Sequence, residues 1–280
     1  MKAFLIQKRT KQPKIIKIKL IFKIFLVKYK IMYSIFKKKY YLKDIIPNNY
    51  IDIHNHILMG LDDGAKTIEE TNRLIDLMKS INISASIPTP HTFTGLWNNT
   101  PKSIKTSYDL VIRNSENSTF LKGYASEYML DLNLIETVKK ETLLCMFENY
   151  ILIEFNLFYY PVNLYEMLFE LKLHNYKIVI AHPERYLYLH NSINKYRKLK
   201  EFGVYFQLNL LSLIGYYGKE IQAMAEVLLH NGLYDFTGTD IHNERQISQL
   251  ATKTISFSKR NILGDLLQNN KIFNPFSHVV

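Results

Sequence analysis

YIDIHNHIL, residues 50–58, is a short apolar run that carries an aspartate and two histidines. Side chains alternate in direction along a strand, so His54 and His56 project to the same side if this run is extended. Two imidazoles that point together are suited to bind one metal ion. The same pattern also occurs on exposed strand faces, so the meaning of this pair depends on the rest of the chain.

From residue 50 onward the chain alternates between strand-like and helical patterns. We expect strands at 50–58, 83–91, 121–129, 150–155, 177–182, 204–209 and 234–240. One helix is expected to begin at Thr67, where Glu70 completes a capping box. The other helices are expected near 102–113, 131–140, 161–174, 191–201, 219–230 and 244–253. Seven strand–helix units in succession predict an α/β fold with a parallel sheet, and their number favours a barrel.

Charge is distributed unevenly along the 280 residues. The net charge is +11, of which residues 1–49 contribute +13 and the remaining residues −2. The body of the protein is therefore nearly neutral, and we expect no nucleic-acid partner. The hydrophobic fraction of 47% is typical of a globular protein with a sizeable core.

The basic segment 1–49 is expected to be a leader, followed by a domain at 50–255 and a C-terminal helix and tail at 256–280. Lysines interrupt its apolar residues, so it contains neither a membrane span nor a continuous signal-peptide core. We expect it to be disordered, or in part an upstream extension, with Met32 as the true start. The single cysteine, Cys145, excludes an intramolecular disulfide and indicates a reducing compartment, so we expect a cytoplasmic protein.

Functional residues of a β/α barrel gather at the C-terminal ends of the strands. Nine side chains of metal-binding type fall at or just after the expected strand ends: His54, His56, Asp63, His91, Glu127, Glu154, His182, Asp240 and His242. Some have ordinary explanations, because Asp62-Asp63-Gly64 is typical of a turn. Glu154 does not, since a lone carboxylate within ILIEF would be buried at a cost of several kcal/mol. Their recurrence in chain order predicts a shared metal centre.

Nine ligands exceed what one zinc ion uses, so we expect two or three divalent ions. Mixed nitrogen and oxygen ligands favour Mn, Fe, Zn or Mg. Such a centre binds phosphate and activates water, and Arg185 is placed to bind a phosphate oxygen. A thiol-dependent phosphatase loop is excluded, because Ile151 stands where Cys145 would need an arginine. The sequence also contains no nucleotide-binding glycine motif and no nucleophile elbow.

Several segments together carry a resemblance to a known family: DIHNHILMGLDDGAKTIEE, TPH, the glutamate of ASEY, LIEF, AHPERY and GTDIHN. They resemble the successive motifs of the PHP (polymerase and histidinol phosphatase) superfamily. More narrowly, they resemble the bacterial metal-dependent protein-tyrosine phosphatases of capsule and exopolysaccharide operons. The resemblance covers about residues 40–250.

This resemblance implies a distorted (β/α)7 barrel with three divalent ions, Mn2+ being the first candidate. It implies one site formed by His54, His56, Glu127 and Asp240. It implies that Glu127 bridges to a second site with Glu154 and His182, and that the third site uses Asp63, His91 and His242. Arg245 is the nearest match to a further arginine of the family that binds phosphate, although its spacing is shorter. The implied substrate is phosphotyrosine in the tail of a bacterial tyrosine kinase that regulates polysaccharide export.

Three alternatives remain open from the sequence. A phosphatase of small phosphomonoesters such as histidinol phosphate would use the same centre, although no long insertion after a strand provides a lid. A non-catalytic kinase-binding module would have no reason to keep all nine ligands. An amidohydrolase often uses a lysine on the fourth strand, where this chain has Glu154.

Overall fold

The computed structural model describes residues 39–114 and 118–274. Our expectations for residues 1–38, including a start at Met32, fall outside this part. The chain divides into a unit that ends at Lys39 and a second unit from Tyr40 to Val280. The second unit contains the elements that bear on function and is described below.

The strands of the main sheet run parallel and follow the order of the chain. Six of them form one sheet in the order β4-β5-β6-β7-β8-β9, and β2 pairs in parallel with β3. A further pair consists of β1 and β10. The bounds are β1 Lys39–Tyr41, β2 Tyr50–Asp52, β3 Ile83–Ser86, β4 His91–Thr92, β5 Glu127–Met129, β6 Tyr150–Glu154, β7 Lys177–Ala181, β8 Tyr205–Asn209, β9 Phe236–Gly238 and β10 Thr254–Ser256.

The strand expected at 83–91 is divided between two sheets. Its first part, β3, pairs with β2, whereas its last part, β4, pairs with β5. Pro88 and Pro90 lie between them and have no N–H to donate to a ladder, which explains the interruption.

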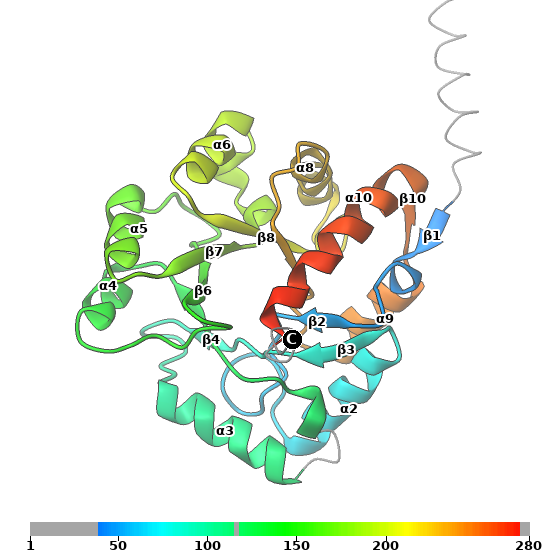
Figure 1. Ribbon diagram of the computed structural model, residues 1–280, viewed down its shortest axis with the longest axis horizontal. Helices are drawn as coiled ribbons and strands as arrows, with labels where there is room; N and C mark the ends of the chain where they lie inside the picture. The colour runs from blue at the N-terminus through cyan, green and yellow to red at the C-terminus, as the bar shows by residue number, and fades with distance from the viewer. Residues whose placement is uncertain (1–38, 115–117, 275–280) are drawn as a thin grey trace, which may run out of the picture. The chain divides into compact units, whose positions relative to one another are not determined.

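The helices lie around the strands (Figure 1). As expected, α2 begins after Thr67, whose side chain accepts a hydrogen bond from the Glu70 N–H. Glu70 does not complete the expected capping box, because its carboxylate accepts from the Lys66 N–H at 2.7 Å instead. Among the residues that the structure describes, no helix has the length and apolar character needed to cross a bilayer. The bounds are α2 Ile68–Lys79, α3 Pro101–Asn114, α4 Leu132–Val138, α5 Leu164–Leu173, α6 Ile193–Glu201, α7 Leu210–Leu213, α8 Lys219–His230, α9 Glu244–Thr252 and α10 Phe257–Gln268; the short 3-10 turns are η1 Leu42–Asp44, η2 Ser118–Phe120, η3 Pro183–Arg185, η4 Leu187–Leu189 and η5 Asn269–Phe273.

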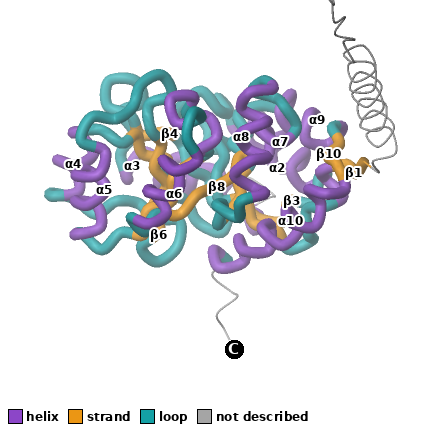
Figure 2. Tube along the Cα trace, turned by 90° about the horizontal axis from the view of Figure 1, so that it is seen from above, coloured by secondary structure: helices purple, strands orange, loops and turns teal. Residues whose placement is uncertain are grey.

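The main sheet curls, so that its first and last strands approach the β2-β3 pair. Parallel bridges join Asn55 to Ile241 and Ser86 to Leu121. Tyr50 and Thr237, on β2 and β9, share a side-chain hydrogen bond of 2.9 Å. The fold is therefore mixed α/β, with a six-stranded parallel sheet curled as a half-barrel, and the strands lie inside a layer of helices (Figure 2).

Alternation along the strands separates an inner from an outer apolar cluster. On β6, Ile151 and Ile153 belong to the large cluster shared with the helices, whereas Leu152 belongs to the inner cluster. Glu154 is two residues beyond Leu152 and so lies on the inner side, at the C-terminal end of the strand. The alternation of ILIE thus directs a carboxylate into the mouth of the sheet.

Both ends of the expected domain extend further than its expected bounds of 50 and 255. Leu42 and Ile46 are buried in the main core, so residues 40–49, expected within the leader, belong to the folded unit. At the other end, Phe273 of η5 is fully buried within the inner cluster. Asn270 donates to the carbonyls of Ile51 (2.9 Å) and Thr237 (2.8 Å), which ties η5 to β2 and β9.

Candidate metal centre

Four of the nine predicted ligands meet at the mouth of the sheet. Nε2 of His54 lies 3.2 Å from Glu127 Oε2 and 3.4 Å from Asp240 Oδ1. Nε2 of His56 lies 3.5 Å and 3.3 Å from the same two oxygens, and 3.4 Å from Nε2 of His54. The Nε2 atoms of His54 and His56 and the Glu127 oxygen lie close enough to one another to hold one ion.

Glu127 extends this group to a second one. Its Oε1 lies 3.1 Å from His182 Nε2, and its Oε2 lies 2.9 Å from His91 Nδ1. Glu154 is within 3.5 Å of His182 and 3.8 Å of His91. Among the described residues, the buried Oε2 of Glu127 has no hydrogen-bond partner. A buried carboxylate oxygen that faces imidazole nitrogens without a hydrogen bond fits a metal ligand.

A third group lies nearer to solvent. Asp63 Oδ1 is 3.4 Å from His242 Nε2 and 3.7 Å from His91 Nε2. The rings of His242 and His56 stack with centroids 3.9 Å apart. The chain thus brings together all nine predicted ligands, in overlapping groups that could each hold an ion: His56, Asp63, His91 and His242; His54, His182 and Asp240; His54, His56 and Glu127; His91, Glu127 and Glu154.

Backbone features bring these side chains close. His182 and Asp240 have positive φ angles of 34° and 55°, which is unusual for residues other than glycine and is typical of functional sites. A Cβ on Gly64 would lie 1.9 Å from the His56 carbonyl oxygen, and one on Gly238 would lie 2.6 Å from the His54 Cβ. Glycine at both positions therefore lets the backbone approach His54 and His56 without a steric clash.

Two residues absent from our prediction orient the first pair of histidines. Asp62 Oδ2 lies 2.6 Å from Nδ1 of His56, and Gln207 Oε1 lies 2.8 Å from Nδ1 of His54. Each histidine thus directs Nε2 into the cluster, the arrangement by which carboxylates and amides fix metal-binding imidazoles. Gln207 was detectable as a polar residue inside the apolar run VYFQLN. Asp62 was masked by the turn pattern.

Arg185 stands beside the cluster. Its Nη1 donates to Asp240 Oδ2 at 2.8 Å, and its guanidinium lies 4.5 Å from the ring centre of Tyr217. Asn209 Nδ2 donates to the same oxygen at 2.9 Å. No sequence pattern had indicated Tyr217, which lies in the loop before Gly218 and is brought here by tertiary packing.

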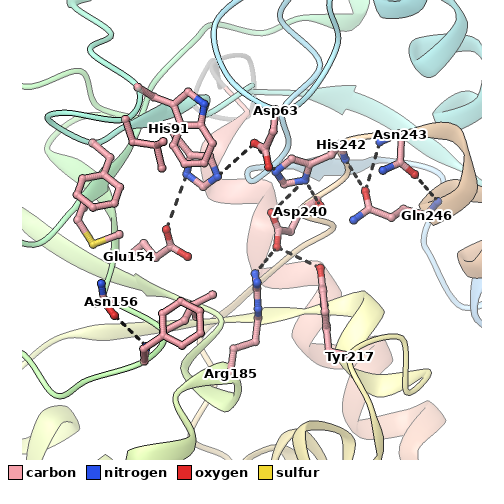
Figure 3. Close-up of a pocket in the computed structure, with 16 residues that line it drawn as sticks. Asp63, His91, Glu154, Asn156, Arg185, Tyr217, Asp240, His242, Asn243 and Gln246 are labelled. Carbon is pink, nitrogen blue, oxygen red and sulfur yellow. Dashed lines mark hydrogen bonds and ion pairs between the residues drawn. The ribbon is translucent and has the colours of Figure 1, made fainter.

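A cavity of about 420 Å³ opens above the cluster, and Asp63, His91, Glu154, Asp240 and Arg185 line it (Figure 3). His242 and Tyr217 line it as well. Arg245, which the resemblance suggested for phosphate, is exposed on α9 and lines a different hollow with Tyr216 and Lys253. The cavity therefore joins Arg185, but not Arg245, to the candidate ligands.

Burial and neighbouring charges shift the pKa values of several of these groups. Burial opposes a charge on His54, but Glu127 and Asp240 outweigh it and raise the pKa to about 10. Burial, together with the charge of Glu127, raises the pKa of Glu154 to about 7. Burial and the charge of Arg185 lower the pKa of His182 to about 4. Buried carboxylates that favour a proton on a neighbouring imidazole also favour a divalent cation, which takes the place of the proton when it binds.

The sequence matches a family described as "Capsular polysaccharide synthesis, CpsB/CapC" over residues 50–276. The chain belongs to this family. The matched range contains all nine candidate ligands and Arg185.

Curated relatives and a solved structure agree with this membership. The chain is 30% identical over 196 residues to a putative tyrosine-protein phosphatase CapC of Staphylococcus aureus, covering 69% of this chain and 77% of that protein. It is 30% identical over 201 residues to the tyrosine-protein phosphatase YwqE of Bacillus subtilis, with the same coverage. A solved structure matches with a TM-score of 0.68 and 26% identity, covering 80% of this chain and 93% of the other. It comes from work on YwqE and on CpsB of Streptococcus pneumoniae, described there as metal-dependent tyrosine phosphatases.

Proposed function

We propose that this CpsB/CapC family member is a metal-dependent protein-tyrosine phosphatase. The observation that carries the proposal is the convergence of nine metal-binding side chains in overlapping groups, next to a cavity that five of them line together with Arg185. Family relatives that bear the name tyrosine-protein phosphatase support the substrate class.

We assign three divalent ions to the centre, with Mn2+ as the first candidate and Fe, Zn or Mg as alternatives. His54, His56, Glu127 and Asp240 would hold the first. Glu127 would bridge to a second held with Glu154 and His182, and Asp63, His91 and His242 would hold the third. The contacts of Glu127 with His54, His91 and His182 support a bridging role. The nitrogen and oxygen donors favour these metals over thiolate-bound ones.

Divalent ions at such a centre neutralise phosphate charge and make water acidic enough to attack at neutral pH. The chain's own contribution is to place the phosphate. Arg185 presents a guanidinium that matches a phosphate oxygen pair, and the Tyr217 ring beneath it restricts its position. Asn209 keeps Asp240 hydrogen-bonded when Arg185 turns to the substrate.

The proposal extends to the barrel topology, the protein substrate and the place of action. Counting the run that contains β3 and β4 as one strand gives a distorted (β/α)7 barrel, which the bridge between Asn55 and Ile241 supports as its closure. We propose the tail of a bacterial tyrosine kinase as substrate and the cytoplasm as the place of action. The single cysteine supports a reducing compartment.

The decisive experiment compares substrates on the purified protein, with its metal content measured beforehand. We expect release of phosphate from a phosphotyrosine peptide, loss of this activity on chelation, and its return on addition of Mn2+. A preference for histidinol phosphate would instead favour the small-molecule phosphatase. Binding of a kinase tail without phosphate release would favour the non-catalytic module.

A further inference from the structure

The cavity above the metal centre is lined by residues of two kinds. Five candidate ligands, Asp63, His91, Glu154, Asp240 and His242, line it together with Arg185. Its apolar lining, called here the apolar wall, consists of Phe93, Leu96, Trp97, Met129, Leu157 and Phe158. Phe93, Leu96 and Trp97 follow β4, Met129 is the last residue of β5, and Leu157 and Phe158 follow β6.

Phe158 is displayed to solvent with 89% of its surface exposed. Leaving a phenyl ring exposed forgoes about 1.5–3 kcal/mol of burial energy, so an exposed ring beside a cavity calls for an explanation. The backbone here is fixed: Asn156 Oδ1 accepts from the N–H of Phe158 at 2.9 Å (Figure 3). The Asn156 carbonyl in turn accepts from the Tyr188 hydroxyl at 2.8 Å.

Aromatic rings support this loop from below. Phe155 stacks on Tyr186 with centroids 5.1 Å apart, and Tyr186 stacks on Tyr188 at 5.8 Å. Tyr160 meets the edge of Tyr188 at 5.8 Å. Since Phe155 and Tyr186 are fully buried, the loop rests on the core, and the backbone of Phe158 is held there by its hydrogen bond to Asn156.

Trp97 connects the loop after β4 to the metal centre. Its ring stacks on His91 with centroids 4.5 Å apart and planes 14° from parallel. The neighbouring Leu96 is 59% exposed. An apolar surface therefore begins directly beside a candidate ligand and extends outward to Leu96.

We propose that Leu96, Trp97 and Phe158 form a recognition surface for the aromatic ring of phosphotyrosine. The inference rests on the proposed phosphatase function and adds to it the residues that select an aryl phosphate. With the phosphate at the ligands and Arg185, the phenyl ring lies against the apolar wall. The short side chains of phosphoserine and phosphothreonine place no ring there, so the wall favours phosphotyrosine.

The test measures kcat/KM for a phosphotyrosine peptide and for the same peptide with phosphoserine. We expect Phe158→Ala to lower the ratio of the two values about tenfold, the scale of one aromatic contact with its buried surface. Phe158→Tyr keeps the ring and should restore the ratio. Val162→Ala is the matched control, since Val162 is 80% exposed on the same loop but is not among the residues that line the cavity.

A binding measurement separates this inference from the proposed function. Trp97 is the single tryptophan, so its fluorescence reports directly on a non-hydrolysable phosphonate analogue of the phosphotyrosine peptide. We expect about tenfold weaker binding in Phe158→Ala and unchanged binding in Val162→Ala. Equal effects of the two substitutions, or an unchanged ratio in Phe158→Ala, would overturn the recognition surface while leaving the phosphatase in place. Failure of the wild type to release phosphate from any peptide would overturn the proposed function, and the fluorescence titration would still decide the inference.

Discussion

The carboxylate of Asp62 lies 2.6 Å from Nδ1 of His56 and accepts the backbone N–H of His91 at 2.9 Å. One buried side chain thereby orients two candidate ligands from different parts of the chain. Its other oxygen accepts the N–H of Gly64 at 2.9 Å, which shapes the loop that carries Asp63. Asp62 is therefore a positioning residue for the ligand group nearer to solvent, which contains His56, Asp63 and His91.

Replacing Asp62 with asparagine should weaken metal binding. The amide keeps the size but loses one acceptor and the negative charge that favours a proton on Nδ1 of His56. Loss of such a partner typically costs tenfold to a hundredfold in metal affinity. Competition with a chromogenic chelator measures this directly. Asp109→Asn, which removes an exposed carboxylate paired with Lys105, is the control and should bind metal like the wild type; equal affinities in all three proteins would contradict the role of Asp62.

Replacing Glu127 with alanine should lower kcat more than the replacement of most other single ligands. A bridging carboxylate serves two ions, and without it two cations would lie close together with less negative charge between them. We expect at least about a hundredfold loss in kcat, the scale of removing a key electrostatic element. Metal analysis should show fewer ions per chain than the wild type. A variant with full metal content and a near-normal rate would show that Glu127 does not bridge.

The sequence indicated the strands, helices and candidate ligands better than the hydrogen-bond partners that position those ligands. Alternation of strand and helix, and HxH and DxH spacings, are local patterns, so most strands could be located, together with nine candidate ligands that the fold brings close to one another. The division of the 83–91 strand also had a local signal in Pro88 and Pro90, which we did not use. The partners of the ligands depend on tertiary packing: Tyr217 reaches Asp240 across 23 residues, and Gln207 reaches His54 across 153. The periodicity of a single sequence gives no information on contacts between residues so far apart in the chain.

Activity should depend on metal and not on the thiol. Burial raises the pKa of Cys145 to about 11, so little thiolate exists at neutral pH. Cys145 lies between α4 and β6, outside the residues that line the cavity. Cys145→Ser should therefore keep kcat within about twofold, while a chelator abolishes phosphate release. Inactivation of a correctly folded Cys145→Ser protein would require a different mechanism.

Glu184 should make stability depend on pH. Burial raises the pKa of this carboxyl from 4.5 to about 7, although it accepts from the Asn209 N–H and the Tyr234 hydroxyl. Because the folded state holds the proton more tightly, its contribution to stability is present below pH 4.5 and is lost as pH rises to about 7. The loss amounts to about 3 kcal/mol. Glu184→Gln removes this titration, so the difference in unfolding free energy between the two proteins should grow across that range and stay level above it; a difference that is constant with pH would contradict the buried titration.

Replacing Arg185 with alanine should separate phosphate binding from metal binding. Asp240 keeps its hydrogen bonds from Asn209 (2.9 Å) and from Tyr217 (3.3 Å), so the ions should remain. A charge-assisted contact to phosphate is worth about 1.5–3 kcal/mol, or roughly a tenfold to hundredfold loss in kcat/KM. Arg185→Lys should restore only part of this, because an ammonium group does not reproduce the two-pronged contact of a guanidinium.

Arg245→Ala provides the comparison for Arg185. Arg245 is exposed on α9 and lies outside the cavity, so its removal should leave kcat/KM on a phosphotyrosine peptide unchanged. Metal content, measured on both variants, should equal that of the wild type. If Arg185→Ala lost metal along with activity, Arg185 would act through Asp240 as a support of the centre. If Arg245→Ala were the weaker enzyme, the phosphate would sit on the α9 side, and the assignment of Arg185 would fall.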